Sequence, residues 1–85
     1  MVIHILGRKD DIKKMQQLST DIKRICTEVM CPAEIKLTHN FSEIPGQSFN
    51  AASTPIIFFN QQVEFEGMPD LKILKSKIIQ IRNMS

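Results

Sequence analysis

Four consecutive apolar residues, Ile56-Ile57-Phe58-Phe59, lie between Ser53-Thr54-Pro55 and Asn60-Gln61-Gln62. The run joins β-branched to aromatic side chains and is too short for a helix, so it predicts a strand. Because successive side chains of a strand point to opposite faces, an unbroken apolar run predicts burial on both faces and a central place in the sheet. Pro55 has no N–H to donate to a ladder, which puts it at or just before the first position of this strand.

Apolar periodicity predicts three further strands and two long helices around this central strand. Val2–Leu6 is a short apolar strand ended by Gly7, and its His4 is expected to be a partly buried side chain between the sheet and a helix. Two segments alternate apolar with polar residues, which is typical of edge strands: Ala33–Thr38 and Val63–Glu66. The helices are expected over Asp10–Met30, where Pro32 stops the pattern, and from Pro69 onward, with Asp70 in the first turn. The segment from His39 to Ser53 predicts a short helix or loop over the second face of the sheet.

The order strand–helix–strand at the start of the chain predicts a right-handed crossover between parallel strands. The short connection through Asn60-Gln61-Gln62 predicts an antiparallel hairpin. A chain of 85 residues with 42% hydrophobic and 24% charged residues is a single domain, residues 1–85, with ordinary globular composition. Its charge of +2 is spread through helical patterns rather than gathered in a patch, so nucleic-acid binding is not expected. No apolar run approaches the length of a membrane span, so no membrane association is expected. No signal peptide is recognised, and a cytoplasmic location is expected.

Taken together, these elements resemble the thioredoxin fold in its minimal form, as in glutaredoxins and small thioredoxin-like proteins. Thr54-Pro55 before the apolar strand, and Val63-Glu64-Phe65-Glu66-Gly67 before the last helix, carry most of the resemblance. It implies an α/β fold, β-α-β-(α)-β-β-α, with a four-stranded mixed sheet in the order 2-1-3-4 and helices on both faces. It also implies a cis Thr54–Pro55 bond beside the N-terminus of the first helix.

The chain departs from the redox-active members of this family at the loop after the first strand. Those proteins place Cys-x-x-Cys there, where the N-terminus of the helix stabilises a thiolate. Alignment on Gly7 puts Asp10 and Lys13 at the two cysteine positions, and neither can form a disulfide or act as a thiol nucleophile. The chain is therefore not expected to be a dithiol enzyme.

Cys26 and Cys31 stand near the other end of the same helix, five positions apart. An uninterrupted helix would hold their Cα atoms near or beyond the 7 Å limit for a disulfide, although the break at Pro32 could let Cys31 fold back. Two buried, inert thiols are the favoured interpretation, and a thiol–disulfide oxidoreductase using this pair is the alternative. No metal ligand set and no cofactor are predicted, since only two thiols exist and His39 lies at no typical ligand spacing from them.

The leading hypothesis is a thioredoxin-like module that binds an unknown protein or peptide without catalysis. By resemblance, its groove lies between the helix N-terminus and the proline loop, at residues Arg8, Lys9, Asp10, Lys13, Ser53, Thr54 and Pro55. A further alternative uses Arg8, Lys9 and Lys13 to bind glutathione or another anion at the helix N-terminus. Asp10 and Asp11 oppose that alternative, because they already complement the helix dipole.

Overall fold

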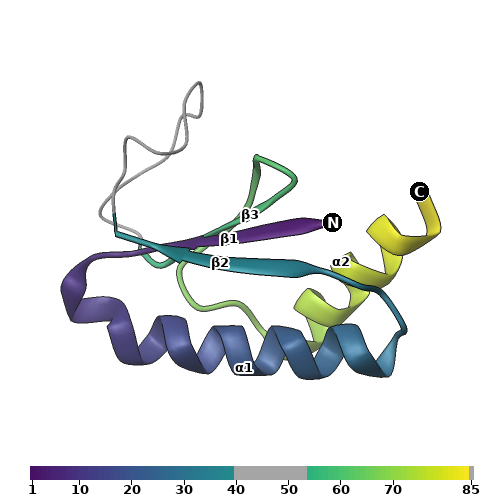
Figure 1. The fold of residues 1–85 in the computed structure, drawn as a ribbon, viewed down its shortest axis with the longest axis horizontal. Coiled ribbons are helices and arrows are strands. Elements are labelled where there is room, and N and C mark those ends of the chain that lie inside the picture. Colours follow the sequence, from purple (N-terminus) through teal and green to yellow (C-terminus); the bar gives the residue numbers. More distant parts are fainter. Residues whose placement is uncertain (40–53, 85) are drawn as a thin grey trace.

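The computed structural model describes residues 1–39 and 54–84 (Figure 1). In that part of the chain, two helices and four strands follow one another in the predicted order. The strands are β1 (Val2–Leu6), β2 (Glu34–Thr38), β3 (Ile56–Phe59) and β4 (Gln62–Glu66). The helices are α1 (Ile12–Glu28), preceded by a short 3-10 turn η1 (Lys9–Asp11), and α2 (Leu71–Met84).

The four strands form one mixed sheet in the order β2-β1-β3-β4, which confirms the predicted order. β1 pairs with β2 in parallel, with Ile3 beside Ile35, and with β3 antiparallel, with Ile5 beside Ile57. β3 and β4 form the predicted antiparallel hairpin. Its turn has positive φ at both Asn60 (52°) and Gln61 (71°), the backbone of a type I′ turn, whose twist matches that of the strands it joins.

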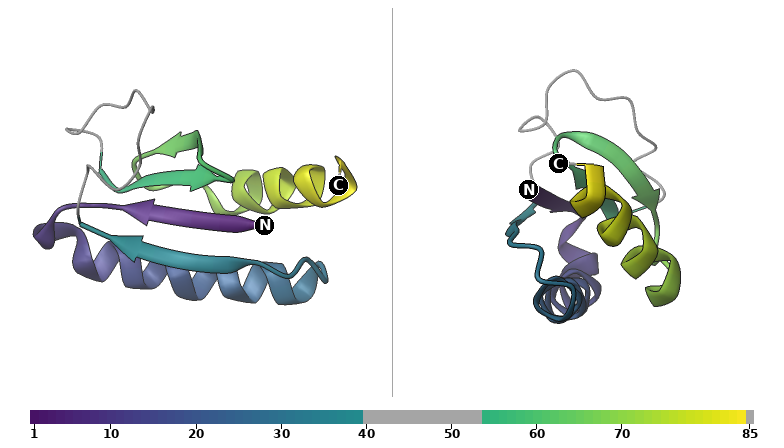
Figure 2. Two further views of the ribbon diagram at one scale, coloured as in Figure 1. Left: turned by 45° about the horizontal axis from the view of Figure 1, so that its top comes forward. Right: turned by 90° about the vertical axis from the view of Figure 1, so that its right-hand side faces the viewer.

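Both described helices pack on the same face of the sheet (Figure 2). Alternate residues of β1 and β3 contribute Ile3, Ile5, Ile57 and Phe59 to this core, against the apolar stripe of α1 and against Leu74 and Ile78 of α2. The opposite face holds a smaller cluster of Leu6, Ile56 and Phe58. All four residues of β3 are therefore buried, as its apolar run predicts. The helix or loop expected over this second face falls almost wholly on residues 40–53, outside the described residues.

The side chain of His4 is half-buried, as expected, and β1 sets it beside Phe58, on the face away from the two described helices. His4 follows Ile3, which faces the helices, so the alternation along a strand requires this placement. Whether a helix packs against His4 depends on residues 40–53, which lie outside the described residues.

The helix boundaries also differ slightly from those predicted. The first turn of the predicted Asp10–Met30 helix is the 3-10 turn η1, and the last helix starts after Pro69 and Asp70 rather than at Pro69. Asp70 lies just before α2, where its carboxylate accepts a hydrogen bond from the backbone N–H of Lys72 at 2.7 Å. It therefore acts as the N-terminal cap of α2. No helix in residues 1–39 and 54–84 has both the length and the apolarity needed to cross a bilayer.

Candidate functional site

The chain leaves β1 at Gly7 and enters η1 directly. A Cβ atom at Gly7 would lie 2.6 Å from the sulfur of buried Met15 and 3.1 Å from the Cβ atom of Asp11, so any other residue would force Met15 to move. The backbone N–H of Gly7 donates to the carbonyl of Thr38 at 3.1 Å, which continues the parallel ladder past the end of β1. The N-terminus of the helical segment is thereby held against the carboxyl ends of β1 and β2.

Asp11 connects this loop to the proline loop before β3. Its carboxylate accepts a hydrogen bond from the backbone N–H of Arg8 at 3.0 Å and another from the hydroxyl of Thr54. Its own N–H donates to the carbonyl of Arg8 at 2.9 Å. Two segments that are more than forty residues apart in the sequence are thus joined through one carboxylate.

The hydrogen bonds at Asp11 also set its ionisation. The hydroxyl of Thr54, and after it the N–H of Arg8, hold the pKa of the Asp11 carboxyl below its ordinary value. The positive charges of Lys14 and Arg8 act in the same direction, while burial opposes them. A stable carboxylate therefore occupies the start of the helical segment, where negative charge complements the helix dipole.

The predicted groove residues are only partly brought together. Arg8, Lys9, Asp10 and Lys13 are exposed on the loop and the start of α1, and half-buried Thr54 contacts the same loop through Asp11. The Thr54–Pro55 bond is cis, as the resemblance implies, but the ring of Pro55 is buried. The Pro55 carbonyl accepts from the N–H of Gly67 at 2.8 Å. Ser53 lies outside the described residues.

Sequence reasoning missed two residues at this end of the sheet, Asp11 and His39. Asp11 had been recognised only as a first-turn carboxylate, because a helix-capping pattern does not reveal a bond to a distant threonine. His39 lies directly after β2, and its Nδ1 donates to the carbonyl of Gly7 at 2.9 Å. The only signal for it was its position at the end of a predicted strand.

Cys26 and Cys31 lie at the opposite end of α1, where the helix ends in a left-handed turn. Met30 has φ of 56°. The N–H of Cys31 donates to the carbonyl of Cys26 at 2.9 Å, and the N–H of Met30 donates to the carbonyl of Thr27 at 3.3 Å. These are the two bonds of a Schellman motif, in which the first and last residues of the turn come into apolar contact. The motif folds Cys31 back beside Cys26.

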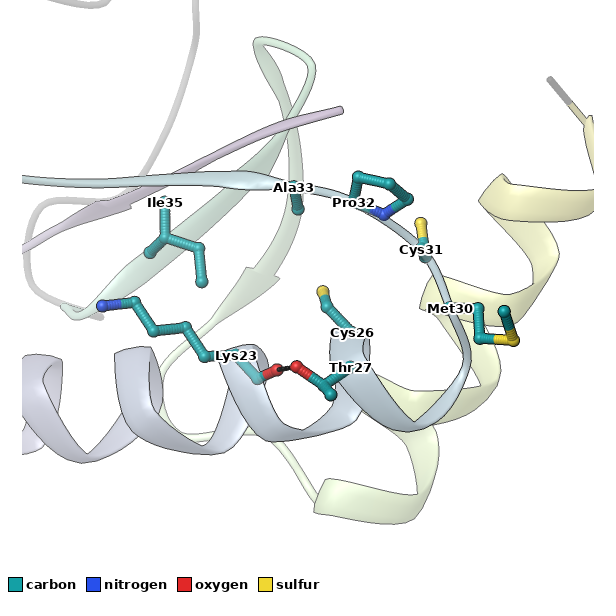
Figure 3. A pocket seen from close by; sticks show the side chains of 8 residues that line it. All are labelled: Lys23, Cys26, Thr27, Met30, Cys31, Pro32, Ala33 and Ile35. Atoms are coloured by element: carbon teal, nitrogen blue, oxygen red, sulfur yellow. Dashed lines mark hydrogen bonds between the residues drawn. The ribbon is translucent and has the colours of Figure 1, made fainter.

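Both thiols are free and buried. Burial, and secondarily the neighbouring Cys31, raises the pKa of the Cys26 thiol, so the reactive thiolate is disfavoured. The two cysteines help to line a hollow of about 540 Å³ between the C-terminal half of α1 and the start of β2 (Figure 3). This cysteine hollow is bounded by Lys23, Cys26, Thr27, Met30, Cys31, Pro32, Ala33 and Ile35.

Within residues 1–39 and 54–84, no three side chains of His, Cys, Asp or Glu converge as a metal site would require. The predicted groove and the cysteine hollow lie at opposite ends of α1, so the two candidate sites are separate. The chain matches no family model, and no curated protein or solved structure is significantly similar to it.

Proposed function

We propose that this chain is a non-catalytic, thioredoxin-like module that binds an acidic segment of another protein at its β1–α1 loop. The observation that carries the proposal is the carboxylate of Asp11, hydrogen-bonded to Arg8 and Thr54 at the end of the helical segment. This arrangement puts a carboxylate, rather than a thiol, at the start of the helical segment. The sheet order and the cis Thr54–Pro55 bond support the thioredoxin-like part of the proposal.

The charge at the loop favours an acidic partner. Arg8, Lys9, Lys13 and Lys14 are all exposed, whereas the carboxylate of Asp11 is engaged by hydrogen bonds. Within residues 8–14, this leaves Asp10 as the one other acidic side chain. A cluster of this kind attracts carboxylates mainly through long-range electrostatics. A small anion such as glutathione is less well suited, because the amide of Arg8 that would hold it already donates to Asp11.

The test uses peptides selected from a random library on the immobilised protein. We expect the selected peptides to be acidic and to lose binding to an Arg8→Glu/Lys13→Glu variant. The matched control, Lys72→Glu/Lys75→Glu, changes the charge equally on α2 and should bind as the unmodified chain does. If the selected peptides bind both variants equally well, the β1–α1 loop is not the binding surface.

Two further measurements separate the competing functions. Turnover of insulin disulfides, abolished by Cys26→Ser or Cys31→Ser, would replace this proposal with a thiol–disulfide enzyme. Titration with glutathione that shifts only the amide signals of Arg8, Lys9, Lys13 and Thr54 would favour the anion-binding alternative.

A further inference from the structure

In residues 1–39 and 54–84, no strand pairs with the outer side of β2. β2 is the terminal strand of the sheet, and no other described element runs along its free side (Figure 2). The N–H of Glu34 donates to Met1, and the carbonyl of Thr38 accepts from Gly7, so these two residues direct their backbone groups toward β1. Because successive residues of a strand alternate, the backbone groups of Ile35 and Leu37 point outward. They are available to a further strand.

The side chains along this edge divide by face. Glu34 and Lys36 lie on the face away from the helices, where their charged groups are 3.7 Å apart and more than half exposed. Ile35 and Leu37 lie on the helix face, beside Ile3 and Ile5. Leu37 is 45% exposed.

We propose that β2 pairs antiparallel with β2 of a second copy of this chain, centred on Ile35. In that register Glu34 stands opposite Lys36 of the second copy, and Lys36 opposite its Glu34. Both cross-strand pairs then join opposite charges, which favours this alignment. The neighbouring register, centred on Lys36, would set two lysines against each other and is disfavoured. An antiparallel pair of identical strands is two-fold symmetric, so the assembly closes as a dimer that joins the two four-stranded sheets.

The same register fills the cysteine hollow. Leu37 of the second copy falls opposite Ala33, and directly opposed side chains project from the same face of a sheet. Ala33 lines the hollow together with Ile35, so that leucine would lie over it (Figure 3). Pro32, which has no N–H, lies before the start of β2 at Glu34 and so removes no hydrogen-bond donor from that strand.

The other edge of the sheet does not offer this complementarity. The charged residues of β4 are Glu64 and Glu66, both acidic, so two copies of β4 would bring like charges together. Glu64 also forms an ion pair with Lys77 of α2, with an O–N distance of 3.0 Å. Self-association is therefore assigned to β2 alone.

The experiment is sedimentation of the full chain over a series of concentrations, combined with charge exchange. We expect a dimer for the unmodified chain, and a dissociation constant raised roughly tenfold to a hundredfold by either Glu34→Lys or Lys36→Glu. Mixing these two variants should restore association, because each then faces opposite charges. The double variant Glu34→Lys/Lys36→Glu should dimerise by itself.

Glu66→Lys on β4 and Lys72→Glu on α2 are the matched controls, since they change the net charge equally and should leave the dimer intact. Circular dichroism of every variant separates loss of pairing from loss of folding. The proposal fails if the unmodified chain stays monomeric at millimolar concentration. It fails equally if folded single variants associate as the unmodified chain does, or if their mixture stays monomeric.

Discussion

At the scale of single residues, Asp11 has the most consequences for the molecule. Its carboxylate accepts from the amide of Arg8 and the hydroxyl of Thr54, and so ties the start of the helical segment to the proline loop. A charged acceptor with two donors stabilises the fold only while it remains ionised. The free energy of unfolding should therefore depend on pH through the ionisation of Asp11.

Replacing Asp11 by Asn tests that dependence. The folded-state pKa of Asp11 lies below its unfolded value, so its contribution is complete above the ordinary carboxyl pKa of about 4 and is lost as pH falls through the folded pKa. We expect Asp11→Asn to lower the free energy of unfolding by about 1 kcal/mol at neutral pH, and the gap to the unmodified chain to close in acid. Urea unfolding at several pH values measures both effects. An equivalent Asp10→Asn variant is the control, and a gap that stays constant with pH would contradict this account.

At the scale of secondary-structure elements, the turn that ends α1 places a residue other than glycine in a left-handed backbone conformation. Met30 adopts φ of 56° and is 85% exposed, so its side chain makes few contacts while its backbone is in the left-handed region. Glycine enters this region at no steric cost and is the usual residue at this position of a Schellman motif.

We therefore expect Met30→Gly to raise the free energy of unfolding by about 1 kcal/mol. Thermal or urea unfolding measures the change. Gln16→Gly, within α1 and also at an exposed position, is the matched control, and it should lower stability by about 1 kcal/mol. A loss of stability in both variants would mean that Met30 does not hold the left-handed conformation.

The same helix end is also held from α2. Nη1 of Arg82 donates to the carbonyl of Val29 at 2.6 Å, which places a positive charge at the C-terminus of α1 and joins the two helices. Arg82→Met keeps much of the side chain but removes this bond, and we expect a loss of about 1 kcal/mol in urea unfolding. Lys75→Met removes an exposed ion pair with Glu28 and should cost only a few tenths of that amount. Equal losses in the two variants would show that the bond to Val29 adds nothing.

The elements were predictable where their side-chain pattern depends on burial alone. The apolar run Ile56–Phe59 identified the central strand, and the alternation in Ala33–Thr38 and Val63–Glu66 identified the two edges, because burial on one or both faces leaves its own period in the sequence. The hydrogen bond from Thr54 to Asp11 has no corresponding pattern in the sequence. Nor did the reversal at Met30, since a residue other than glycine gives no signal for a left-handed backbone.

At the scale of the whole molecule, the sheet has one face under two helices and two edges of different character. β4 is acidic and bound to α2 through Glu64, whereas β2 alternates Glu34 and Lys36 and leaves Leu37 exposed. The proposed peptide surface consists of residues of the β1–α1 loop and the start of α1, whereas the proposed dimer edge consists of residues of β2. The two functions could therefore operate together without competing for residues.

The dimer and the cysteine hollow are connected by geometry, which yields a last prediction. Cys26 and Cys31 are buried in the single chain, and Leu37 of a second copy would cover the hollow that they line. We expect both thiols to react slowly with excess iodoacetamide, and the rate to fall further as protein concentration rises through the dimerisation range.

In the Lys36→Glu variant the rate should fall only at concentrations roughly tenfold to a hundredfold higher, and in urea both chains should react equally fast. Mass spectrometry of the alkylated protein gives the rate for each cysteine. A concentration-independent rate in a chain that sedimentation shows to be dimeric would place the contact elsewhere than on β2. The register would then be wrong even though a dimer exists, because no antiparallel pairing centred on Ile35 can leave the strand side of the hollow open.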